Sequence, residues 1–312
     1  MIIEFQRQIL GDRVRNEAFA AALERVIVPG RTTVADLGSG TGFLAFLASR
    51  LGAKRCVLCE ESELLDLSRE IARANGIRNC TFLRANSREV ARPPRVDVVV
   101  SETLGNLALE ENALETLRDA RRWLAPDGVL VPRRLRQHVA PVTSARLLDQ
   151  LDVWPRIGFG LDFGAARRVS LHNAYVRSIG PGDLLAGAAQ TWDEIDFRAG
   201  GGSVRRATVE WKLARATPLF GFALWWECEL VADAPRVRLS TAPGAPRTHW
   251  EQIWLPPLGP VEARGGETLR LALECDSRPQ VKINLVWRTT LLDRAGEVRV
   301  ETRQDMRKGS LG

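Results

Sequence analysis

A short glycine-rich turn between an apolar strand and a helix constrains the fold of this 312-residue chain more than any other feature. The apolar run Thr33–Leu37 leads directly into Gly38–Gly42, which reads Gly-Ser-Gly-Thr-Gly, and Phe43–Leu51 is a helical segment that ends at Gly52. Glycines let the backbone approach a ligand closely, and the amino terminus of the following helix faces that ligand. The spacing differs from the G-x-G-x-x-G that suits a dinucleotide pyrophosphate. The turn therefore predicts a site for another nucleotide-like cofactor.

Strand-like and helix-like segments alternate through the first part of the chain. Such alternation predicts a parallel, doubly wound sheet. The expected helices are 6–28, 43–51, 64–74 and 110–124, and the further expected strands are 56–59, 80–83, 96–100 and 129–131, the last after a turn at 126–128. Ligands of such sheets bind beyond the carboxyl ends of the strands, so residues that directly follow a strand are the first functional candidates.

The periodicity changes after Pro132. Apolar residues now alternate with polar ones, as in Val209–Leu213, and turns with Gly and Pro separate many short segments. This pattern predicts an antiparallel β-barrel or sandwich. The length also favours two domains, so we expect a Rossmann-like domain over residues 1–131 and a β-barrel domain over residues 132–312. A poorly periodic segment, 147–190, interrupts the β pattern.

The composition narrows the class of protein. Apolar content of 45% and charged content of 26% are typical of a soluble globular protein. No apolar run approaches the roughly 18 residues of a membrane span, and no signal peptide is recognisable, so we expect a cytoplasmic protein. The five cysteines and three histidines have no disulfide-framework or metal-ligand spacing. We therefore expect no metal site.

The chain is basic, with a net charge of +6 and a pI of about 9.5. Nearly all of the basic charge is arginine, which together with much Ala and Gly fits a GC-rich, bacterial source. Arginine contacts phosphate well, but here the arginines are spread along the whole chain and do not cluster. The charge distribution therefore argues against a nucleic-acid partner.

Two carboxylates follow the fourth predicted strand. Glu102 emerges just after the apolar run Val96–Val100, and Glu111 comes nine residues later, near the start of the next predicted helix. These positions allow both carboxylates to converge on one cationic group. A planar guanidinium, with five donors in a rigid fork, is the cation that best matches two carboxylates. Taken alone, a pair of glutamates is more often solvated surface acid than a binding site, so the interpretation depends on the rest of the sequence.

Three motifs, in this order, resemble the protein arginine methyltransferase family over nearly the whole chain. Asp36–Gly42 is similar to motif I of class I S-adenosylmethionine-dependent methyltransferases. Ser101–Gly105 with Glu111 resembles the double-glutamate loop of the family, and Thr248–Trp250 resembles its Thr-His-Trp loop. Upstream, Leu10–Arg15 is similar to the Leu-x-Asp-x-x-Arg segment of the family.

The resemblance implies S-adenosyl-L-methionine as the methyl donor and S-adenosyl-L-homocysteine as its product. Arg15 would pair with the carboxylate of the cofactor's methionine end, Gly38 would lie along that end, and Glu60 would hold the ribose hydroxyls. The turn at 86–88 would face the adenine. The implied cofactor-binding residues are Arg15, Asp36, Gly38, Gly40, Gly42, Glu60, Ser87 and Arg88.

The same resemblance assigns the substrate side. Glu102 and Glu111 would clamp the guanidinium of the substrate. Asp12 would pair with His249 beside the pocket and pass the released proton outward, and Trp250 would help to form the pocket wall. The family also implies that residues 147–190 form a dimerisation arm, so a homodimer is expected.

Several residues depart from the family pattern. The amino-terminal helix of the family usually carries two tyrosines that close over the cofactor, whereas the one tyrosine here is Tyr175, in the other half of the chain. The residue after the first glutamate, often Trp, is Thr103, and Arg88 replaces an adenine-facing glutamate of many members. Ile9, close to the predicted pocket, could limit the room for a second methyl group. Without the two tyrosines, we expect the lid over the cofactor to be short or built differently.

The substrate class stays open. The resemblance implies an arginine in a protein or peptide. A small guanidino compound or a natural-product peptide is an alternative, because a basic chain attracts a strongly basic tail only weakly at long range. RNA methylation would appear as affinity that falls steeply with salt, but no Asn-Pro-Pro-Tyr-like motif follows the fourth strand. A non-catalytic dimeric scaffold is the last alternative, and the presence of both glutamates argues against it.

Overall fold

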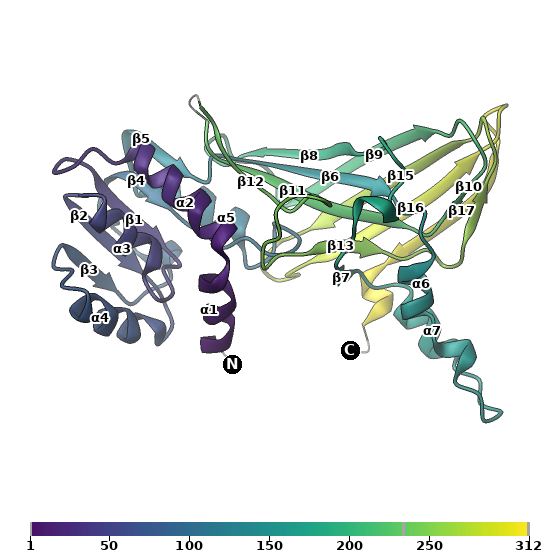
Figure 1. Ribbon diagram of the computed structural model, residues 1–312, viewed down its shortest axis with the longest axis horizontal. Helices are drawn as coiled ribbons and strands as arrows, with labels where there is room; N and C mark the ends of the chain where they lie inside the picture. Colours follow the sequence, from purple (N-terminus) through teal and green to yellow (C-terminus); the bar gives the residue numbers. More distant parts are fainter. Residues whose placement is uncertain (1, 233–234, 311–312) are drawn as a thin grey trace.

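The computed structural model of the chain describes residues 2–232 and 235–310. A five-stranded parallel sheet with helices forms the amino-terminal part, and an elongated group of antiparallel sheets forms the carboxyl-terminal part (Figure 1). The predicted α/β plus β fold class is therefore confirmed. One continuous cluster of buried apolar side chains runs through both parts. We propose residues 1–131 and 132–312 as the two domains, since the last parallel strand ends at Val131 and the first antiparallel strand begins at Arg134.

The parallel sheet has the strand order β3-β2-β1-β4-β5. Its strands are β1 (Thr33–Leu37), β2 (Arg55–Cys59), β3 (Cys80–Leu83), β4 (Val96–Val100) and β5 (Leu124–Val131). Residues 126–128, predicted as a turn, lie within β5, opposite a register shift between Val96 and Val98. The strand order reverses between β1 and β4, and ligands of such sheets bind at this switch point. Gly38 follows β1 there, and Ser101 follows β4.

The helices of this part agree with the prediction except near Glu111. Helices α3 (Phe43–Arg50) and α4 (Leu64–Ala74) lie where they were expected. The predicted helix 110–124 is wrong in extent, because α5 covers only Ala113–Asp119. Glu111 and Asn112 have φ angles of +56° and +59°, in the left-handed region that a right-handed helix excludes. Within residues 2–232 and 235–310, no helix is long and apolar enough to cross a membrane.

Two helices, not the predicted single helix over 6–28, precede the sheet (Figure 1). Helix α1 covers Ile2–Gly11 and α2 covers Arg13–Val26. Asp12 between them has extended backbone angles, and its side chain accepts a hydrogen bond from the backbone N–H of Arg15. Aspartate is favoured at this capping position because it satisfies a free N–H of the first helical turn. The cap therefore starts a new helix where periodicity alone predicts continuation.

The second part consists of three antiparallel sheets around a shared apolar interior. Their strands are β6 (Arg134–Pro141), β7 (Tyr175–Arg177), β8 (Gln190–Asp196), β9 (Val204–Lys212), β10 (Thr217–Leu219), β11 (Phe222–Val231), β12 (Val237–Ser240), β13 (Gln252–Leu255), β14 (Val261–Ala263), β15 (Thr268–Asp276), β16 (Asn284–Leu292) and β17 (Val298–Asp305). Six strands pair as β7-β13-β11-β6-β8 with β12 on β11, four pair as β17-β16-β15-β9, and β10 pairs with β14. Alternation explains the packing: Leu269, Leu271 and Leu273 of β15 are buried, and the residues between them face outward.

The insertion at 147–190 is partly helical. It contains α6 (Arg146–Leu151), α7 (Gly164–Ser170) and then β7, which joins the six-stranded sheet. The helices and the loop between them extend away from the sheets (Figure 1). That loop, residues 152–163, is called the arm tip below. It carries Phe159, which is 94% exposed, and Leu161, which is 64% exposed.

Candidate active site

Glu102 lies buried at the switch point of the parallel sheet. The strand end is fixed because Ser101 Oγ donates a hydrogen bond of 2.8 Å to the carbonyl of Leu37, at the end of β1. The Glu102 carboxylate accepts from Arg15 Nε at 2.7 Å, and Arg15 Nη2 lies 2.6 Å from the same oxygen. Its other oxygen accepts from the backbone N–H of Leu104 at 3.1 Å. Both side chains of the ion pair are nearly inaccessible to solvent, at 6% for Arg15 and 5% for Glu102.

Most of the predicted site residues line one or both of two adjoining cavities. A small one, about 40 Å³, is lined by Ile9, Arg15, Asp36, Gly38, Gly40 and Glu102, among others. A larger one, about 320 Å³, is lined by Gly38, Glu60, Ser87, Arg88, Thr103 and Glu111, among others. Gly38 lines both, so the cavities share a wall at the glycine turn. The larger volume lies within the range of about 300–1,000 Å³ that small-molecule sites occupy.

Glu60 and the turn at 86–88 line the larger cavity. Side chains in both segments accept hydrogen bonds from backbone N–H groups, which fix their positions. Glu60 Oε2 accepts from the backbone N–H of Gly40 at 2.9 Å, and its Oε1 accepts from that of Ser62 at 2.9 Å. The carboxylate therefore connects the end of β2 to the glycine turn. On the opposite side, Asn86 Oδ1 accepts from the backbone N–H of Arg88 at 3.2 Å, which shapes the turn.

Asp36 and Gly42 serve the internal structure of the turn. Asp36 Oδ2 accepts from the backbone N–H of Ala45 at 3.0 Å, in the first turn of α3. Burial raises the pKa of this carboxyl group to about 7. Gly42 has φ of +86°, and a Cβ there would lie 2.6 Å from the Phe46 ring. Gly42 lines neither cavity. Packing against Phe46 therefore explains why glycine is required at this position, and the predicted contact with a ligand is not needed to explain it.

Helix α1 covers the glycine turn with Gln6, a residue that the sequence did not single out. A Cβ on Gly40, which has φ of +52°, would lie 2.9 Å from Gln6 Oε1. Thr41 Oγ1 also lies 3.5 Å from this oxygen. A glutamine in an amphipathic helix gives no signal of such a role. Helix α1 therefore contacts the glycine turn through a polar side chain, with no tyrosine.

Asp12 and His249 join the two parts of the molecule beside Arg15. Asp12 Oδ2 lies 2.8 Å from His249 Nδ1 and accepts from the backbone N–H of His249, also at 2.8 Å. Burial acts to raise the pKa of Asp12, but the hydrogen bonds from His249 and from the backbone N–H of Arg15 outweigh it and hold that pKa below its usual range. The ionised Asp12 carboxylate therefore accepts hydrogen bonds from residues of both parts of the molecule.

Two tryptophans of the antiparallel part hold the loop that follows Glu102. Trp250 Nε1 donates to the carbonyl of Leu104 at 2.8 Å, and Trp226 Nε1 donates to the carbonyl of Gly105 at 3.1 Å. Trp250 is only 5% exposed and lines neither cavity at Gly38. The indole binds the loop backbone, and the place of Trp250 in the wall of a substrate pocket stays a prediction. No sequence pattern marks Trp226, because a tryptophan in an apolar strand indicates no more than core packing.

Glu111 lies at the surface of the larger cavity, and Glu102 lies in the smaller one. Partial burial raises the pKa of Glu111 above its ordinary value, and repulsion from the Glu102 and Glu110 carboxylates raises it further. The structure does not place them in a common cavity, so the predicted guanidinium clamp stays a prediction.

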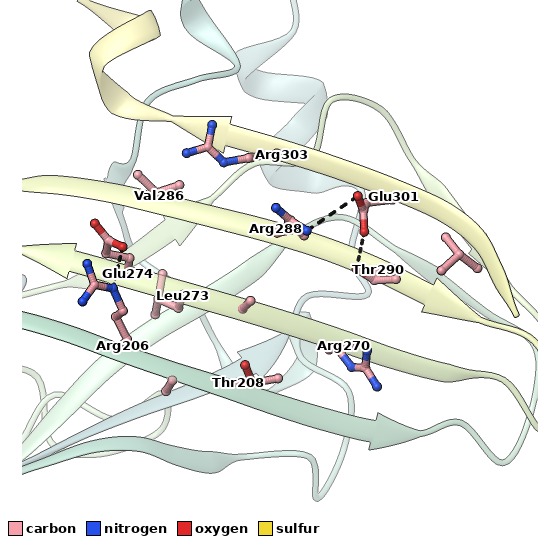
Figure 2. A pocket seen from close by; sticks show the side chains of 13 residues that line it. Arg206, Thr208, Arg270, Leu273, Glu274, Val286, Arg288, Thr290, Glu301 and Arg303 are labelled. Atoms are coloured by element: carbon pink, nitrogen blue, oxygen red, sulfur yellow. Dashed lines mark hydrogen bonds and ion pairs between the residues drawn. The ribbon is translucent and has the colours of Figure 1, made fainter. Parts of the chain in front are cut away.

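A wider depression, about 690 Å³, lies on the outer face of the four-stranded sheet (Figure 2). Four arginines and two glutamates are among the residues that line it. Arg206 Nε lies 2.8 Å from Glu274 Oε2, and Arg288 Nη1 lies 3.8 Å from Glu301 Oε1. Because these opposite charges pair across neighbouring strands, the face resembles an ordinary solvated sheet surface. None of the predicted site residues lines it.

Two family models match most of the chain. Residues 34–128 match the methyltransferase domain, and residues 135–289 match the arginine methyltransferase oligomerization subdomain. An arginine N(omega)-methyltransferase of Streptomyces achromogenes subsp. streptozoticus is 32% identical over 272 residues, which cover 85% of this chain and 74% of that protein. The histone-arginine methyltransferase CARMER of Drosophila mojavensis is 26% identical over 295 residues, which cover 90% of this chain and 54% of that protein.

Solved structures show the same fold. The Trypanosoma brucei PRMT1 enzyme–prozyme heterotetrameric complex with AdoHcy aligns with a TM-score of 0.84 and 22% identity, over 96% of each chain. Arabidopsis thaliana protein arginine methyltransferase 10 aligns with a TM-score of 0.80 and 23% identity, over 96% of this chain and 97% of that one. The sequence identity to the Streptomyces enzyme, along most of both chains, is the stronger argument for relationship. On these grounds the chain belongs to the arginine methyltransferase family.

Proposed function

We propose that this protein transfers a methyl group from S-adenosylmethionine to a guanidino nitrogen of arginine in a protein or peptide. The observation that carries the proposal is Glu102, a buried carboxylate at the switch point, next to the glycine turn and already bound to the guanidinium of Arg15. Arg15 takes up Oε2, whereas Oε1 accepts from the backbone N–H of Leu104 and has a second lone pair that could accept from a substrate guanidinium. The family relationship supplies the reaction class.

The cavities at Gly38 fit the proposed cofactor. Gly38 and Gly40 have positive φ angles, and a Cβ on Gly38 would lie 3.1 Å from Thr103 Cγ2, so only glycine leaves the turn open there. Glu60 would hold the ribose, Ser87 and Arg88 would border the adenine, and Arg15 would bind the carboxylate of the methionine end. The bound cofactor would supply a methyl group activated on a sulfonium sulfur. Contacts to Glu102 and Asn16 take up three of the five N–H donors of Arg15, as counted over the described residues, and leave two for this role.

Glu102 and Glu111 would orient the substrate. Methyl transfer is an in-line displacement, so the attacking nitrogen must be held about 3–3.5 Å from the methyl carbon and opposite the sulfur. A guanidinium has a pKa above about 12 and does not deprotonate freely. Two carboxylates would localise its charge on the nitrogens that they bind and leave the third nitrogen nucleophilic. Ile9, which lines the small cavity, would border that nitrogen.

Asp12 and His249 would remove the proton that the methylated nitrogen releases. Asp12 holds His249 through Nδ1, which leaves Nε2 to accept a proton from the site. The Asp12 carboxylate also accepts a hydrogen bond from the backbone N–H of Arg15. Asp12 therefore contacts both His249, the proposed proton acceptor, and Arg15, which we propose binds the cofactor.

A small guanidino compound, including free arginine, is the second candidate substrate. The Streptomyces relative is named as an arginine methyltransferase, and the Drosophila relative as a histone-arginine methyltransferase. The net charge of +6 favours the smaller substrate, because a basic protein repels the basic tails of histones.

We also propose that the protein forms a homodimer through its arm. The arm tip exposes Phe159 and Leu161 on a loop that extends from the molecule, and such a patch is costly in water unless a partner covers it. The matched oligomerization subdomain supports this role. The dimerisation arm is therefore the segment 147–190, and its partner would be a second copy of the chain.

A labelled-methyl assay tests the proposed reaction. Wild-type protein is incubated with S-adenosylmethionine labelled on the methyl group and with free arginine, an arginine-containing peptide or whole histone. A peptide with lysine in place of arginine is the control. We expect label in the arginine-containing acceptors alone, and the ratio of kcat/KM values identifies the substrate class. No transfer to any guanidino acceptor, with cofactor bound, would reject the proposal.

A further inference from the structure

Trp226 connects the core of the antiparallel part to the loop that carries Glu102. It lies on β11, is 1% exposed and donates from Nε1 to the carbonyl of Gly105 at 3.1 Å. Its ring packs edge-on against Trp250 with 5.1 Å between ring centroids. Trp250 in turn donates to the carbonyl of Leu104. Two indoles from one domain therefore hold two consecutive carbonyls of the other domain.

These carbonyls lie in the two peptide units that directly follow the one whose N–H contacts the Glu102 carboxylate. The backbone N–H of Leu104 donates to Glu102 Oε1 at 3.1 Å, so any rotation of this backbone moves the carboxylate. The loop is tight at this point, since a Cβ on Gly105 would lie 1.9 Å from Glu110 Oε2. Glu110 closes the loop by accepting from the backbone N–H of Leu107 at 3.3 Å. With so little free space, the hydrogen bond of Trp226 restricts the orientation of the loop.

We infer that Trp226 is a positioning residue for methyl transfer: its indole N–H fixes the Gly105 carbonyl and so the backbone turn that presents Glu102 to the guanidino group. The inference rests on the proposed function. Phenylalanine would fill most of the same space in the core but has no N–H donor. The effect of Trp226 is thus separable from its packing.

Two variants isolate this hydrogen bond. Trp226→Phe removes it, and Trp211→Phe is the matched control, because Trp211 is also buried and donates from Nε1 to a carbonyl, that of Ala188, at 2.6 Å. Both variants lose one buried hydrogen bond, but only the bond of Trp226 reaches the loop after β4, whereas the bond of Trp211 stays within the antiparallel part. For Trp226→Phe alone, we expect kcat to fall on the order of tenfold, with the KM and the Kd for S-adenosylmethionine little changed. The two variants should have similar melting temperatures.

Hydrogen–deuterium exchange of the peptide that spans 101–111 tests the same inference without relying on activity. We expect faster exchange there in Trp226→Phe than in Trp211→Phe or the wild type. Equal kcat values and equal exchange in the two variants would overturn the inference. If the wild type methylates no guanidino acceptor, the proposed function fails, and the exchange comparison alone decides the role of Trp226. Should Trp226→Phe not fold, 3-benzothienylalanine at position 226 keeps the indole shape without the N–H and is measured in its place.

Discussion

Arg15 and Glu102 form a buried ion pair between helix α2 and the end of strand β4, with 2.6 Å between Arg15 Nη2 and Glu102 Oε2. Buried pairs are sensitive to the loss of one partner, because the remaining charge is left uncompensated at a cost of about 3–5 kcal/mol. Here the two partners are the residues that we propose bind the cofactor's carboxylate and the substrate's guanidinium. Removal of either charge should therefore lower the free energy of unfolding as well as affect the proposed site.

Glu102→Gln should separate chemistry from cofactor binding. The amide keeps the size of the side chain but neither attracts a guanidinium nor localises its charge, so we expect kcat to fall on the order of 100- to 1,000-fold. Calorimetry should show an unchanged or tighter Kd for S-adenosylmethionine, because Arg15 no longer binds a carboxylate. Glu111→Gln should lose turnover in the same way, and Glu70→Gln, at an exposed position of α4, is the control. Full turnover by both Glu102→Gln and Glu111→Gln would remove the clamp from the mechanism.

Two substitutions of Asp12 should distinguish its role as a helix cap from its proposed role in proton transfer. Asp12→Asn keeps an oxygen that accepts from the backbone N–H of Arg15, whereas Asp12→Ala loses this cap at a cost of about 1 kcal/mol. We expect both variants to lose turnover and only Asp12→Ala to show a clearly lower melting temperature. Because the folded pKa of Asp12 is depressed, its stabilising effect is present above the unfolded pKa and is lost as the pH falls through the folded value. Wild-type turnover in Asp12→Asn would contradict the proton-transfer role.

Asp36 should make stability depend on pH near neutrality. Its folded pKa is raised to about 7 from 3.8, so the folded state binds more protons than the unfolded state between these values. The free energy of unfolding should therefore decrease as the pH rises from about 4 to about 7, by up to a few kcal/mol. Asp36→Asn, which still offers an oxygen to Ala45, should lack this component. Urea denaturation of both proteins at several pH values measures it, and parallel pH curves would exclude it.

The arm tip should control assembly. Phe159→Asp combined with Leu161→Asp places two charges where we propose that a partner binds, so we expect monomers in analytical ultracentrifugation and reduced turnover. Val298→Asp is the control, since Val298 on β17 is apolar and 59% exposed but lies outside the arm. The control variant should sediment like the wild type. A wild-type protein that is monomeric at micromolar concentration would count against the dimer.

Local patterns in the sequence were enough to predict the architecture of the parallel sheet. The strands around the glycine turn are buried on both faces and read as apolar runs, and glycine is required at Gly38 and Gly40 by backbone angles that other residues rarely adopt. Alternation predicted the antiparallel half for the same reason, because side chains of a strand point to opposite faces in turn. The positions of Glu102 and Glu60 at strand ends also followed from these runs.

The tertiary structure alone decided which groups meet. The break at Asp12 depends on a capping bond, and the bond from Asp12 to His249, 237 positions away, was expected from the family resemblance and from no local pattern. Gln6 over the glycine turn and Trp226 at Gly105 carry no recognisable pattern, since their roles arise from the docking of one element on another. Periodicity reports which face of an element is buried, but hydrogen bonds and ion pairs depend on distances between segments that only the packed chain establishes.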